Sequence, residues 1–384
     1  DRRQRQMCIR DRIDIGVKVC EPGEKHKESF RSASNAAATG GVTSLVTRPD
    51  TKPAIDNPEL LEFFKNRSKE FSKVRVFPTA SLTKKNNGKK ITEIGFLHDG
   101  GAVAFTDGFN SIPNTKTFYQ ILKYASDFDT LIIGHPQDHF LTKNTSASSG
   151  IFASIKGLSS SPNMAEKIGI ERDTALINNL NIRYHADQIT TKIGLNVLRY
   201  AKKSNSRITA GTSVHHLLFN ELDIGNYRTF FKLKPPLRSN IDREALIEAI
   251  REGLIDNICS MHTPQDEESK RLPFEEAAPG AVGLETILQA SLSLYHNKVL
   301  TLNQIFRLLA LNPAKIIKTN LGSLDEGRPA DIIIFDPDKP VKINRFKFQS
   351  KSKNTPFDGF NLQGENLLTV VKGEIIFKNN SFKV

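Results

Sequence analysis

The sequence predicts an α/β fold, a (β/α)8 TIM-type barrel with a small accessory β domain, and three observations support this prediction. Short apolar runs alternate with helical stretches from about residue 30, as expected of strands that are each followed by a helix. The distinctive polar residues lie where these strands end, and a barrel places its active site there. After about residue 318 the pattern changes to short alternating strands. The length of 384 residues suits one barrel of about 250 residues plus an accessory region.

The expected barrel spans residues 13–318, and its elements follow from the alternation of apolar and polar residues. A strand over 13–19 opens it, because IDIGVKV places apolar side chains at alternate positions. The strands expected next are 42–47, 74–80, 101–107, 131–136, 181–187, 207–213 and 255–261. The expected helices are 32–41, 59–71, 116–128, 165–180, 191–204, 243–253 and 300–317. The Gly40–Gly41 pair is expected to cap the first helix, since glycine readily adopts the left-handed conformation that ends a helix.

The two ends of the chain depart from this alternation. Residues 319–384 are predicted to form part of the accessory β domain, with strands over 330–338, 341–348, 367–373 and 374–379. Residues 1–12, DRRQRQMCIRDR, are highly charged and lack periodicity. We expect this segment to be non-native, introduced by a sequencing or assembly artefact, or else to be a disordered basic arm.

The composition excludes several classes of protein. Lys and Arg exceed Asp and Glu by 12, but the basic residues are scattered without interleaved aromatic residues, so no nucleic-acid partner is expected. No run of 18 apolar residues and no signal-like segment occurs, so no membrane function is expected. The three cysteines, Cys8, Cys20 and Cys259, lack C-x-x-C spacing, which favours a reducing cytoplasm over a disulfide framework.

Residues 13–23, IDIGVKVCEPG, resemble the strand that opens the barrel of dihydroorotases, which reads roughly D-P-H-V-H-L-R-E-P-G. The two histidines of that motif project from the same side of one strand, because side chains alternate with period two. Gly16 and Lys18 stand at these two positions. A glycine offers no donor atom and an ammonium group repels a dication, so this strand carries neither of the imidazoles that would bind metal.

The resemblance to dihydroorotases, especially the long bacterial type, runs from about residue 13 to the C-terminus. Its further motifs are GGVTSLVTRPDTKPAID (40–56), FTDG (105–108), GHPQD (134–138), KLKPPLR (232–238), LPFEEAAPGAVGLET (272–286), GSLDEGRPADIIIFDP (322–337) and SKNTPFDG (352–359). The resemblance implies a barrel of the metal-dependent amidohydrolase kind. It also implies a composite β domain assembled from both chain ends, of which the N-terminal part is expected to be missing.

In a working member of the family, two zinc ions share a hydroxide that attacks a cyclic amide, and an aspartate transfers the proton. The resemblance places the six metal-binding positions at Gly16, Lys18, Asp107, His135, Gln188 and Met261. Only Asp107 and His135 remain competent ligands, whereas catalytic zinc normally has about three protein ligands. Met261 replaces the aspartate that also acts as the base, and a thioether cannot accept that proton. We therefore expect no catalytic residue, no cofactor and no binuclear centre.

The substrate-binding positions implied by the resemblance have changed as well. Cys20 replaces an arginine, Asp50 and Lys234 replace asparagines, and Gln265 replaces the last histidine of D-H-x-P-H. Gly211 replaces the glutamate of T-x-E-x-x-x-H-H-L. Random sequencing error would not change these positions while leaving PPLR and GLET intact. The sequence therefore predicts a pseudoenzyme that retains the scaffold motifs and has lost the catalytic ones.

The remaining histidines leave an alternative open. A different, mononuclear metal site could in principle use His135, His139, His185, His215, His216 and His262. The more conservative interpretation is that His215 and His216 form hydrogen bonds at strand ends, and that His185 and His262 lie behind the former metal site.

The leading hypothesis is a catalytically inactive dihydroorotase-like protein of pyrimidine biosynthesis. It resembles the non-catalytic chains that assemble with aspartate carbamoyltransferase, so the catalytic chain of that enzyme is the expected partner, and an oligomer is expected. The first alternative is an active zinc-dependent dihydroorotase, which hydrolyses dihydroorotate to N-carbamoyl-aspartate, or a related cyclic amidohydrolase. The second alternative is a small-molecule sensor in which Lys18 and Lys234 attract an anion.

Overall fold

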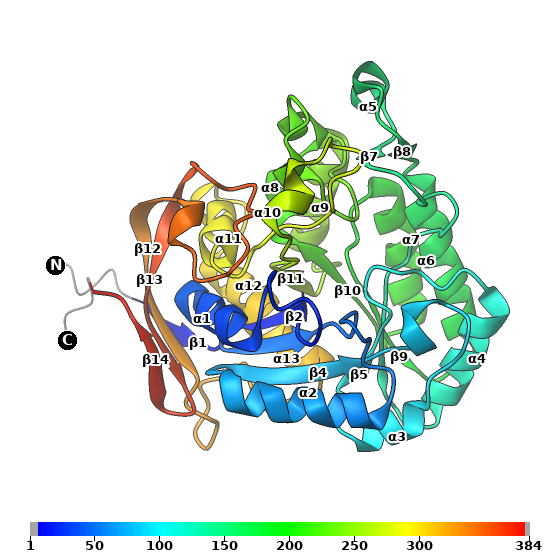
Figure 1. Cartoon of the computed structure of the whole chain (residues 1–384), viewed down its shortest axis with the longest axis horizontal. Helices are drawn as coiled ribbons and strands as arrows, with labels where there is room; N and C mark the ends of the chain where they lie inside the picture. Colours follow the sequence, from blue (N-terminus) through cyan, green and yellow to red (C-terminus); the bar gives the residue numbers. More distant parts are fainter. Residues whose placement is uncertain (1–6, 381–384) are drawn as a thin grey trace.

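The computed structural model describes residues 7–380, and within them eight parallel strands form a nearly closed barrel (Figure 1). The strands, in their order around the sheet, are β11 (Asn257–Cys259), β10 (Ile208–Ser213), β9 (Arg183–Ala186), β6 (Leu131–Gly134), β5 (Ala104–Phe105), β4 (Arg75–Ala80), β3 (Ser44–Thr47) and β2 (Ile13–Val17). The barrel closes between β2 and β11, where Ser260 N donates to Asp14 Oδ1 at 2.8 Å and Lys18 N donates to His262 O at 2.9 Å. The predicted barrel is confirmed.

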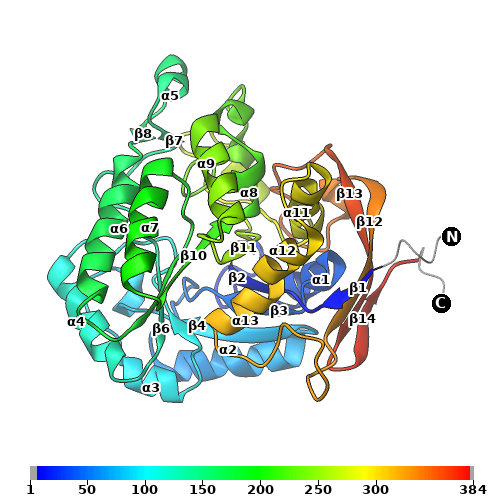
Figure 2. The same cartoon turned by 180° about the vertical axis from the view of Figure 1, so that it is seen from behind.

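Helices surround the barrel (Figures 1 and 2). They are α1 (Phe30–Gly40), α2 (Pro58–Phe71), α3 (Ile94–Asp99), α4 (Thr115–Ser126), α6 (Met164–Ile177), α7 (Lys192–Ser204), α8 (Val214–Leu218), α9 (Asn240–Arg251), α11 (Ile287–His296), α12 (Leu302–Phe306) and α13 (Asn312–Ile316). Several begin at a side-chain cap, as where Thr191 accepts a hydrogen bond from Gly194 N. Gly41 ends α1 with φ 73°, which confirms the predicted glycine cap.

Two barrel elements differ from the sequence prediction. The helix expected over 300–317 is divided into α12, a π-helical turn at Arg307–Leu311, and α13. Pro313 explains the division, because proline has no N–H to continue the α-helical pattern and local π geometry accommodates the break. The strand expected over 101–107 pairs only at Ala104–Phe105, because the chain then turns to bring Asp107 against the loop that follows β4.

The accessory domain is a four-stranded antiparallel sheet in the order β1 (Met7–Arg10), β12 (Ile332–Lys342), β13 (Asn361–Val371) and β14 (Glu374–Lys378). The strand expected over 330–338 continues to Lys342 as one strand, β12, with a register shift between Asp336 and Pro340. Prolines interrupt the ladder there because they cannot donate a backbone hydrogen bond. The strand expected over 341–348 is wrong beyond Lys342, because Arg345–Lys347 forms a 3-10 turn.

The segment 1–12, expected to be non-native or disordered, takes part in this sheet where it is described. Met7–Arg10 pairs with Ile332–Phe335, and the side chains of Asp11 and Arg12 are buried. Arg12 Nε donates to Gly41 O at 2.7 Å, which ties the entry of the barrel to the end of α1. The expected disorder is therefore wrong for residues 7–12, because backbone pairing across the accessory sheet orders them, whereas the expected non-native origin of the segment stays a prediction. Residues 1–6 lie outside the described residues.

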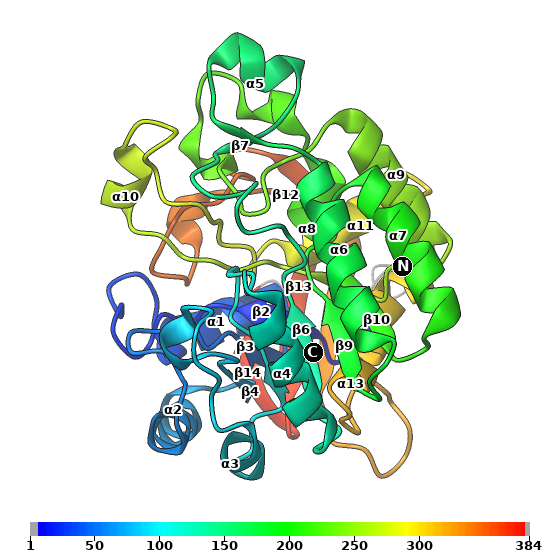
Figure 3. The same cartoon turned by 90° about the vertical axis from the view of Figure 1, so that its right-hand side faces the viewer.

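The connections between the main elements contain short strands, short helices and 3-10 turns. A small arm made of β7 (Ala147–Ser148), α5 (Ile151–Lys156) and β8 (Ser160–Ser161) projects beyond the barrel (Figure 3). The remaining short elements are α10 (Glu267–Arg271) and the 3-10 turns Lys84–Asn86, Glu221–Ile224, Thr229–Phe231 and Arg345–Lys347. No helix within the described part of the chain has the length and apolar character needed to cross a bilayer.

Candidate active site

The six positions expected to bind metal share one end of the barrel. Gly16 lies in β2 with Lys18 just after it, and Asp107, His135, Gln188 and Met261 follow β5, β6, β9 and β11. Because the strands are parallel, their carboxyl ends meet at the same end of the barrel. A Cβ atom added at Gly16 would lie 3.8 Å from Asp187 Oδ2, which shows that β2 and the end of β9 face each other across this region.

The backbone at these positions adopts uncommon conformations. Cys20, Gln188 and Met261 have φ of 63°, 59° and 52°, and Gly16 has φ of 90°. For side chains other than glycine such conformations cost about 1–3 kcal/mol, and they are found in turns as well as at active sites, as at Lys298 and Lys372 in this chain. The uncommon conformations at the strand ends therefore do not by themselves identify a functional site.

Lys18 forms an ion cluster in place of a metal ligand. Its Nζ lies 3.2 Å from Asp50 Oδ2 and 3.9 Å from Glu24 Oε2. Arg48 donates to both oxygens of Asp50, from Nε at 3.0 Å and from Nη2 at 2.7 Å, and packs 3.8 Å from the ring centre of Phe109. Burial raises the pKa of Asp50, but the charges of Arg48 and Lys18 outweigh it and lower this pKa to about 2. The Asp50 carboxylate is thus held by two cations.

The two remaining metal-ligand candidates, Asp107 and His135, differ in whether their polar atoms already have hydrogen-bond partners. Asp107 accepts hydrogen bonds from Leu82 N at 2.9 Å, from Thr83 N at 3.0 Å and from the Thr83 hydroxyl, so both its oxygens are engaged. Burial raises the pKa of Asp107 to about 6, against these hydrogen bonds. His135 is buried beside the ring of Phe109, and its Nδ1 has no partner among the described residues. Burial, with Lys234 and Arg48 nearby, holds the pKa of His135 well below its usual range.

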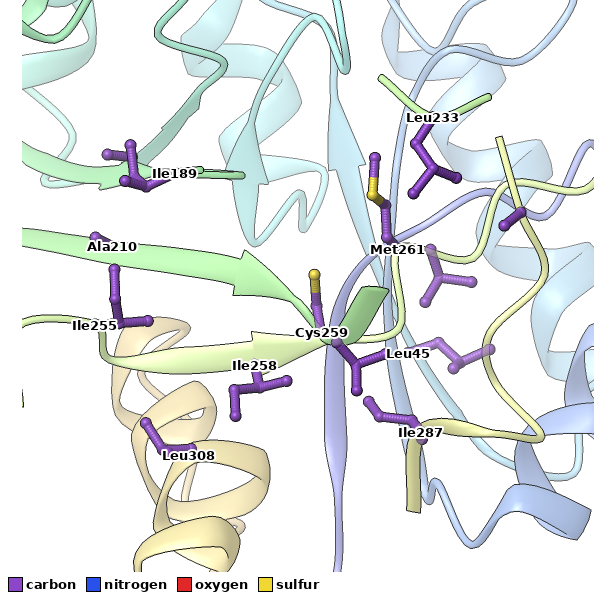
Figure 4. Packing of buried hydrophobic residues seen from close by; sticks show 14 of the residues in the cluster. Leu45, Ile189, Ala210, Leu233, Ile255, Ile258, Cys259, Met261, Ile287 and Leu308 are labelled. Atoms are coloured by element: carbon purple, nitrogen blue, oxygen red, sulfur yellow. The ribbon is translucent and has the colours of Figure 1, made fainter. Parts of the chain in front are cut away.

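Met261 has become part of the hydrophobic core. Its side chain is 2% exposed and belongs to the same apolar cluster as Leu233 and Cys259 (Figure 4). Gln188 engages its amide nitrogen, since Nε2 donates to Asp187 Oδ1 at 3.0 Å and lies 3.0 Å from Cys259 Sγ, while its Oε1 has no partner among the described residues. Neither side chain can replace the histidine or the aspartate that a zinc hydrolase would need at these positions.

The residues present do not fit a binuclear zinc centre. No group of three or more His, Cys, Asp or Glu side chains in residues 7–380 is placed so that it could hold a metal ion. Structural and catalytic zinc sites need three or four such ligands at about 2.0–2.3 Å. This geometry therefore does not support a zinc-dependent reaction at these positions.

The residues expected to contact substrate do not lie together: Asp50 and Lys234 are close to each other, whereas Gln265 lines a separate cavity. Asp50 and Lys234 lie near each other, and Cys20 is a buried free thiol whose pKa burial raises to about 12. Gln265 instead donates to Pro279 O at 2.9 Å and lines a different cavity, of about 180 Å³, that does not include Lys234. At Gly211 a Cβ atom would lie 2.3 Å from Asn257 Oδ1 and 2.8 Å from His185 Nε2, so a glutamate there would require these two side chains to move.

The other histidines are used mainly inside the scaffold. His185 Nδ1 pairs with Thr209 Oγ1 at 2.9 Å, and His216 pairs with Ser213 Oγ at 2.7 Å and Pro235 O at 3.1 Å. His262 lies 3.3 Å from Glu28, His215 packs against Phe357, and His139 packs against Phe140. Within the described residues these imidazoles do not converge on one point that could hold a metal.

Sequence reasoning missed three charged residues that organise this end of the barrel. Arg48 lies in the motif TRPDT, where the dihydroorotase motif M-P-N-T has a methionine. A cation two residues before Asp50 could have indicated that the Asp50 carboxylate is paired. Glu166 on α6 and Arg238 at the end of KLKPPLR are both buried, 3.9 Å apart. No local pattern points to that pair, because its members are far apart in the sequence.

Asp187 gives a testable pH dependence. It is buried, and burial raises its pKa to about 6 despite the hydrogen bond from Gln188 and the charge of Arg48. An acid with a raised pKa in the folded state costs stability as pH rises from the unfolded value of about 4 through the folded value. We expect Asp187→Asn to increase the free energy of unfolding by up to about 3 kcal/mol at pH 8, with a smaller gain at pH 5.

Urea unfolding of the wild type and Asp187→Asn at pH 5, 6.5 and 8 measures this difference. Asp127→Asn is the matched control, because Asp127 is exposed at the end of α4. A gain from Asp187→Asn that is the same at all three pH values would contradict the explanation by burial.

The fold places this chain in the class of (β/α)8 barrels with an accessory β sheet, and solved structures have the same fold. The chain superposes on L-hydantoinase (dihydropyrimidinase) from Arthrobacter aurescens with a TM-score of 0.88 and 24% identity, over 99% of this chain and 87% of that one. Dihydropyrimidinase from Brevibacillus agri gives a TM-score of 0.84 with 17% identity, over 98% and 86%. The chain thus shares its overall fold with these two solved structures.

Sequence comparison identifies the family. A model described as "Dihydro-orotase-like" matches residues 6–194. The chain is 37% identical over 366 residues to a dihydroorotase of Ehrlichia canis, covering 95% of this chain and 81% of the relative. It is also 37% identical over 372 residues to a dihydroorotase of Listeria welshimeri, covering 97% and 87%. The chain belongs to the dihydroorotase family, as the sequence motifs predicted.

Proposed function

We propose that this chain is a non-catalytic member of the dihydroorotase family that acts in pyrimidine biosynthesis. The observation that carries the proposal is the replacement of the catalytic aspartate by Met261, whose side chain is buried in the apolar core. The Lys18 ammonium group, paired with Asp50, adds a positive charge where a zinc hydrolase would present an imidazole. These two side chains remove the base of the family's mechanism and oppose the binding of a metal ion.

Its role would then be structural, as a rigid partner of the aspartate carbamoyltransferase catalytic chain in a cytoplasmic oligomer. The support for this partner is the resemblance to non-catalytic chains that assemble with that enzyme. Co-expression with the transferase of the same genome, followed by size-exclusion chromatography, tests it directly. We expect the two chains to elute together, and separate elution at micromolar concentration would contradict the partnership.

The names of the relatives favour a second candidate, an active zinc-dependent dihydroorotase that hydrolyses dihydroorotate to N-carbamoyl-aspartate. Two measurements separate the candidates: zinc content after purification without chelators, and turnover of dihydroorotate in both directions with added zinc. The dihydroorotase of Listeria welshimeri, purified in parallel, is the positive control.

For a non-catalytic protein we expect turnover at least about a thousandfold below that control, since loss of a general base alone typically costs 10²–10⁴ in rate. We also expect zinc well below one ion per chain. Stoichiometric zinc with clear turnover would establish the enzyme, and would show that side chains other than the six mapped positions hold the metal.

A further inference from the structure

A cavity with a volume of about 330 Å³ lies at the amino end of the barrel, away from the candidate active site. The starts of four neighbouring strands line it, through Leu131 of β6, Arg183 of β9, Thr209 of β10 and Asp256 just before β11. Side chains from residues 312–318, which include α13, line its other side. Small-molecule sites measure about 300–1,000 Å³, so this cavity has room for a small metabolite.

Arg183 connects the starts of the strands to the end of α13. Its Nη2 donates to the carbonyl oxygen of Ile316. Arg183 is half-buried, whereas Leu131 and Ile316 are buried and give the cavity an apolar surface. Nε and Nη1 of Arg183 donate to no atom of residues 7–380. The guanidinium group is thus held in place at one nitrogen and keeps the N–H groups of the other two for a ligand.

Positive charge exceeds negative charge on the cavity wall. The cationic side chains that line it are Arg183, Arg207, Lys315 and Lys318. Asp256 is the carboxylate among the lining residues, and its Oδ2 accepts hydrogen bonds from Lys202 Nζ at 2.8 Å and from Ala210 N at 2.7 Å. A further cation, Lys202, therefore already balances the charge of Asp256, and the four cations of the wall are left in excess.

A second carboxylate, Asp129, lies close by and does not remove this excess. It is exposed and accepts hydrogen bonds from both Arg207 and Lys318. Burial lowers the pKa of Arg183, the charge of Asp129 raises it, and the charge of Arg207 lowers it again. The two guanidinium groups therefore lie close enough to repel each other, and one carboxylate is shared among three cations. An additional anion at this place would relieve that repulsion.

Lys315 carries the positive charge that is not paired. Its side chain is exposed at the cavity, and its Nζ forms no hydrogen bond or salt bridge within the described range 7–380. The hydroxyl group of Ser206, also on the wall, has no hydrogen-bond partner among the same residues. A single exposed ammonium group is usually only solvated. Here it lines the same cavity as the unused N–H groups of Arg183, so that several donors face one space.

We propose that this cavity binds a phosphate group, either free or as the monoester of a small metabolite. The phosphate oxygens would accept hydrogen bonds from Nε and Nη1 of Arg183, in the paired geometry that a guanidinium group offers, and from Lys315. The apolar surface of Leu131 and Ile316 would contact the organic part of an ester. The cavity and Met261 lie at opposite ends of the barrel, so the proposal does not depend on whether the chain is catalytic.

Calorimetric titration of the full chain at constant ionic strength tests the chemistry with inorganic phosphate, glycerol 3-phosphate and acetate. We expect both phosphates to bind at least about tenfold more tightly than acetate, because acetate carries a single charge and fewer oxygens to share between Arg183 and Lys315. Tighter binding of glycerol 3-phosphate than of inorganic phosphate would identify an ester as the ligand. Equal binding of the two would identify the free ion, and either result supports a phosphate site.

Three variants locate the binding. Lys315→Gln should weaken phosphate binding at least about fivefold, and Arg183→Gln at least about tenfold. Lys203→Gln is the matched control, because Lys203 is exposed near the end of α7 and does not line the cavity, although its replacement changes the net charge equally. It should bind phosphate as the wild type does. Since Lys315 is exposed, its replacement should leave the fold unchanged, and the test does not depend on how Arg183→Gln folds.

Several results would overturn the proposal. These are equal binding of phosphate and acetate by the wild type, no binding of either phosphate, and unchanged binding in Lys315→Gln. An equal loss in Lys315→Gln and Lys203→Gln would overturn it as well, since it would reflect only the overall positive charge. Loss of binding in Lys234→Asn, with none in Lys315→Gln, would place the phosphate at the other end of the barrel and would also contradict the proposal.

Discussion

Replacing Glu166 by alanine is expected to lower the free energy of unfolding by about 3–5 kcal/mol. Glu166 is fully buried on α6 and accepts hydrogen bonds from the backbone and hydroxyl groups of Thr190 and Thr191, at 2.6–3.1 Å. Gln137 donates to it as well, and Arg238 Nη2 lies 3.9 Å away. Its removal would leave these donors unsatisfied and the buried guanidinium group of Arg238 with Asp242 as its remaining nearby carboxylate.

Urea unfolding of the two proteins at pH 7 measures the effect. Glu171→Ala is the control on the same helix, because Glu171 is about half exposed and pairs with Lys167 at 3.7 Å on the surface. Such pairs contribute about 0–1 kcal/mol. If Glu166→Ala and Glu171→Ala had equal effects, the carboxylate of Glu166 would not be the centre that joins α6 to the start of α7.

Restoring four family side chains together is expected to convert the chain into a zinc-binding protein. The changes are Gly16→His, Lys18→His, Gln188→His and Met261→Asp. They remove the ammonium group and add three imidazoles and one carboxylate to Asp107 and His135. A Cβ atom at Gly16 meets nothing closer than 3.8 Å, so the first side-chain atom of the histidine fits, although φ of 90° costs the residue about 1–3 kcal/mol.

Without zinc the restored variant should be less stable than the wild type, because the aspartate introduced in place of Met261 would be a buried carboxylate without a partner. With zinc at a hundredfold excess over its dissociation constant it should gain about 2.7 kcal/mol, measured as a rise in the unfolding midpoint, whereas the wild type should not change. The same variant with Met261→Asn is the control for the carboxylate. Turnover need not return, since the substrate positions Cys20, Asp50 and Lys234 remain altered. An equal zinc response in the wild type would show that the ligand positions were mapped wrongly.

The sequence predicted the barrel well because its evidence is local. Alternating apolar residues mark the strands, and Gly41 marks the end of α1. Local patterns failed where distant residues decide the outcome. The pairing of Met7–Arg10 with β12 joins positions more than 320 residues apart, and charge alone suggested a disordered arm. The π-helical turn before Pro313 likewise depends on how one proline is accommodated in an otherwise regular apolar pattern.

The candidate site shows the same division. Motif spacing placed Gly16, Asp107, His135 and Met261 at strand ends that meet. It could not show that Lys18 forms ion pairs with Asp50 and Glu24, or that burial lowers the pKa of Lys234, because both lysines read alike in the sequence. It also could not show that Gln265 faces another cavity, since this follows from its bond to Pro279 O and from the position of Asn354.

The left-handed backbone at Cys20, Gln188 and Met261 bears on how such a chain can evolve. The main chain beside these positions is held by backbone hydrogen bonds, such as Glu24 N to Cys20 O and Ile189 N to Gly211 O, which do not use the three side chains. A substitution there changes the chemistry presented at the strand end without requiring the main chain to move. Descendants could therefore lose or regain individual ligands one at a time, in either direction, while every intermediate kept the same barrel.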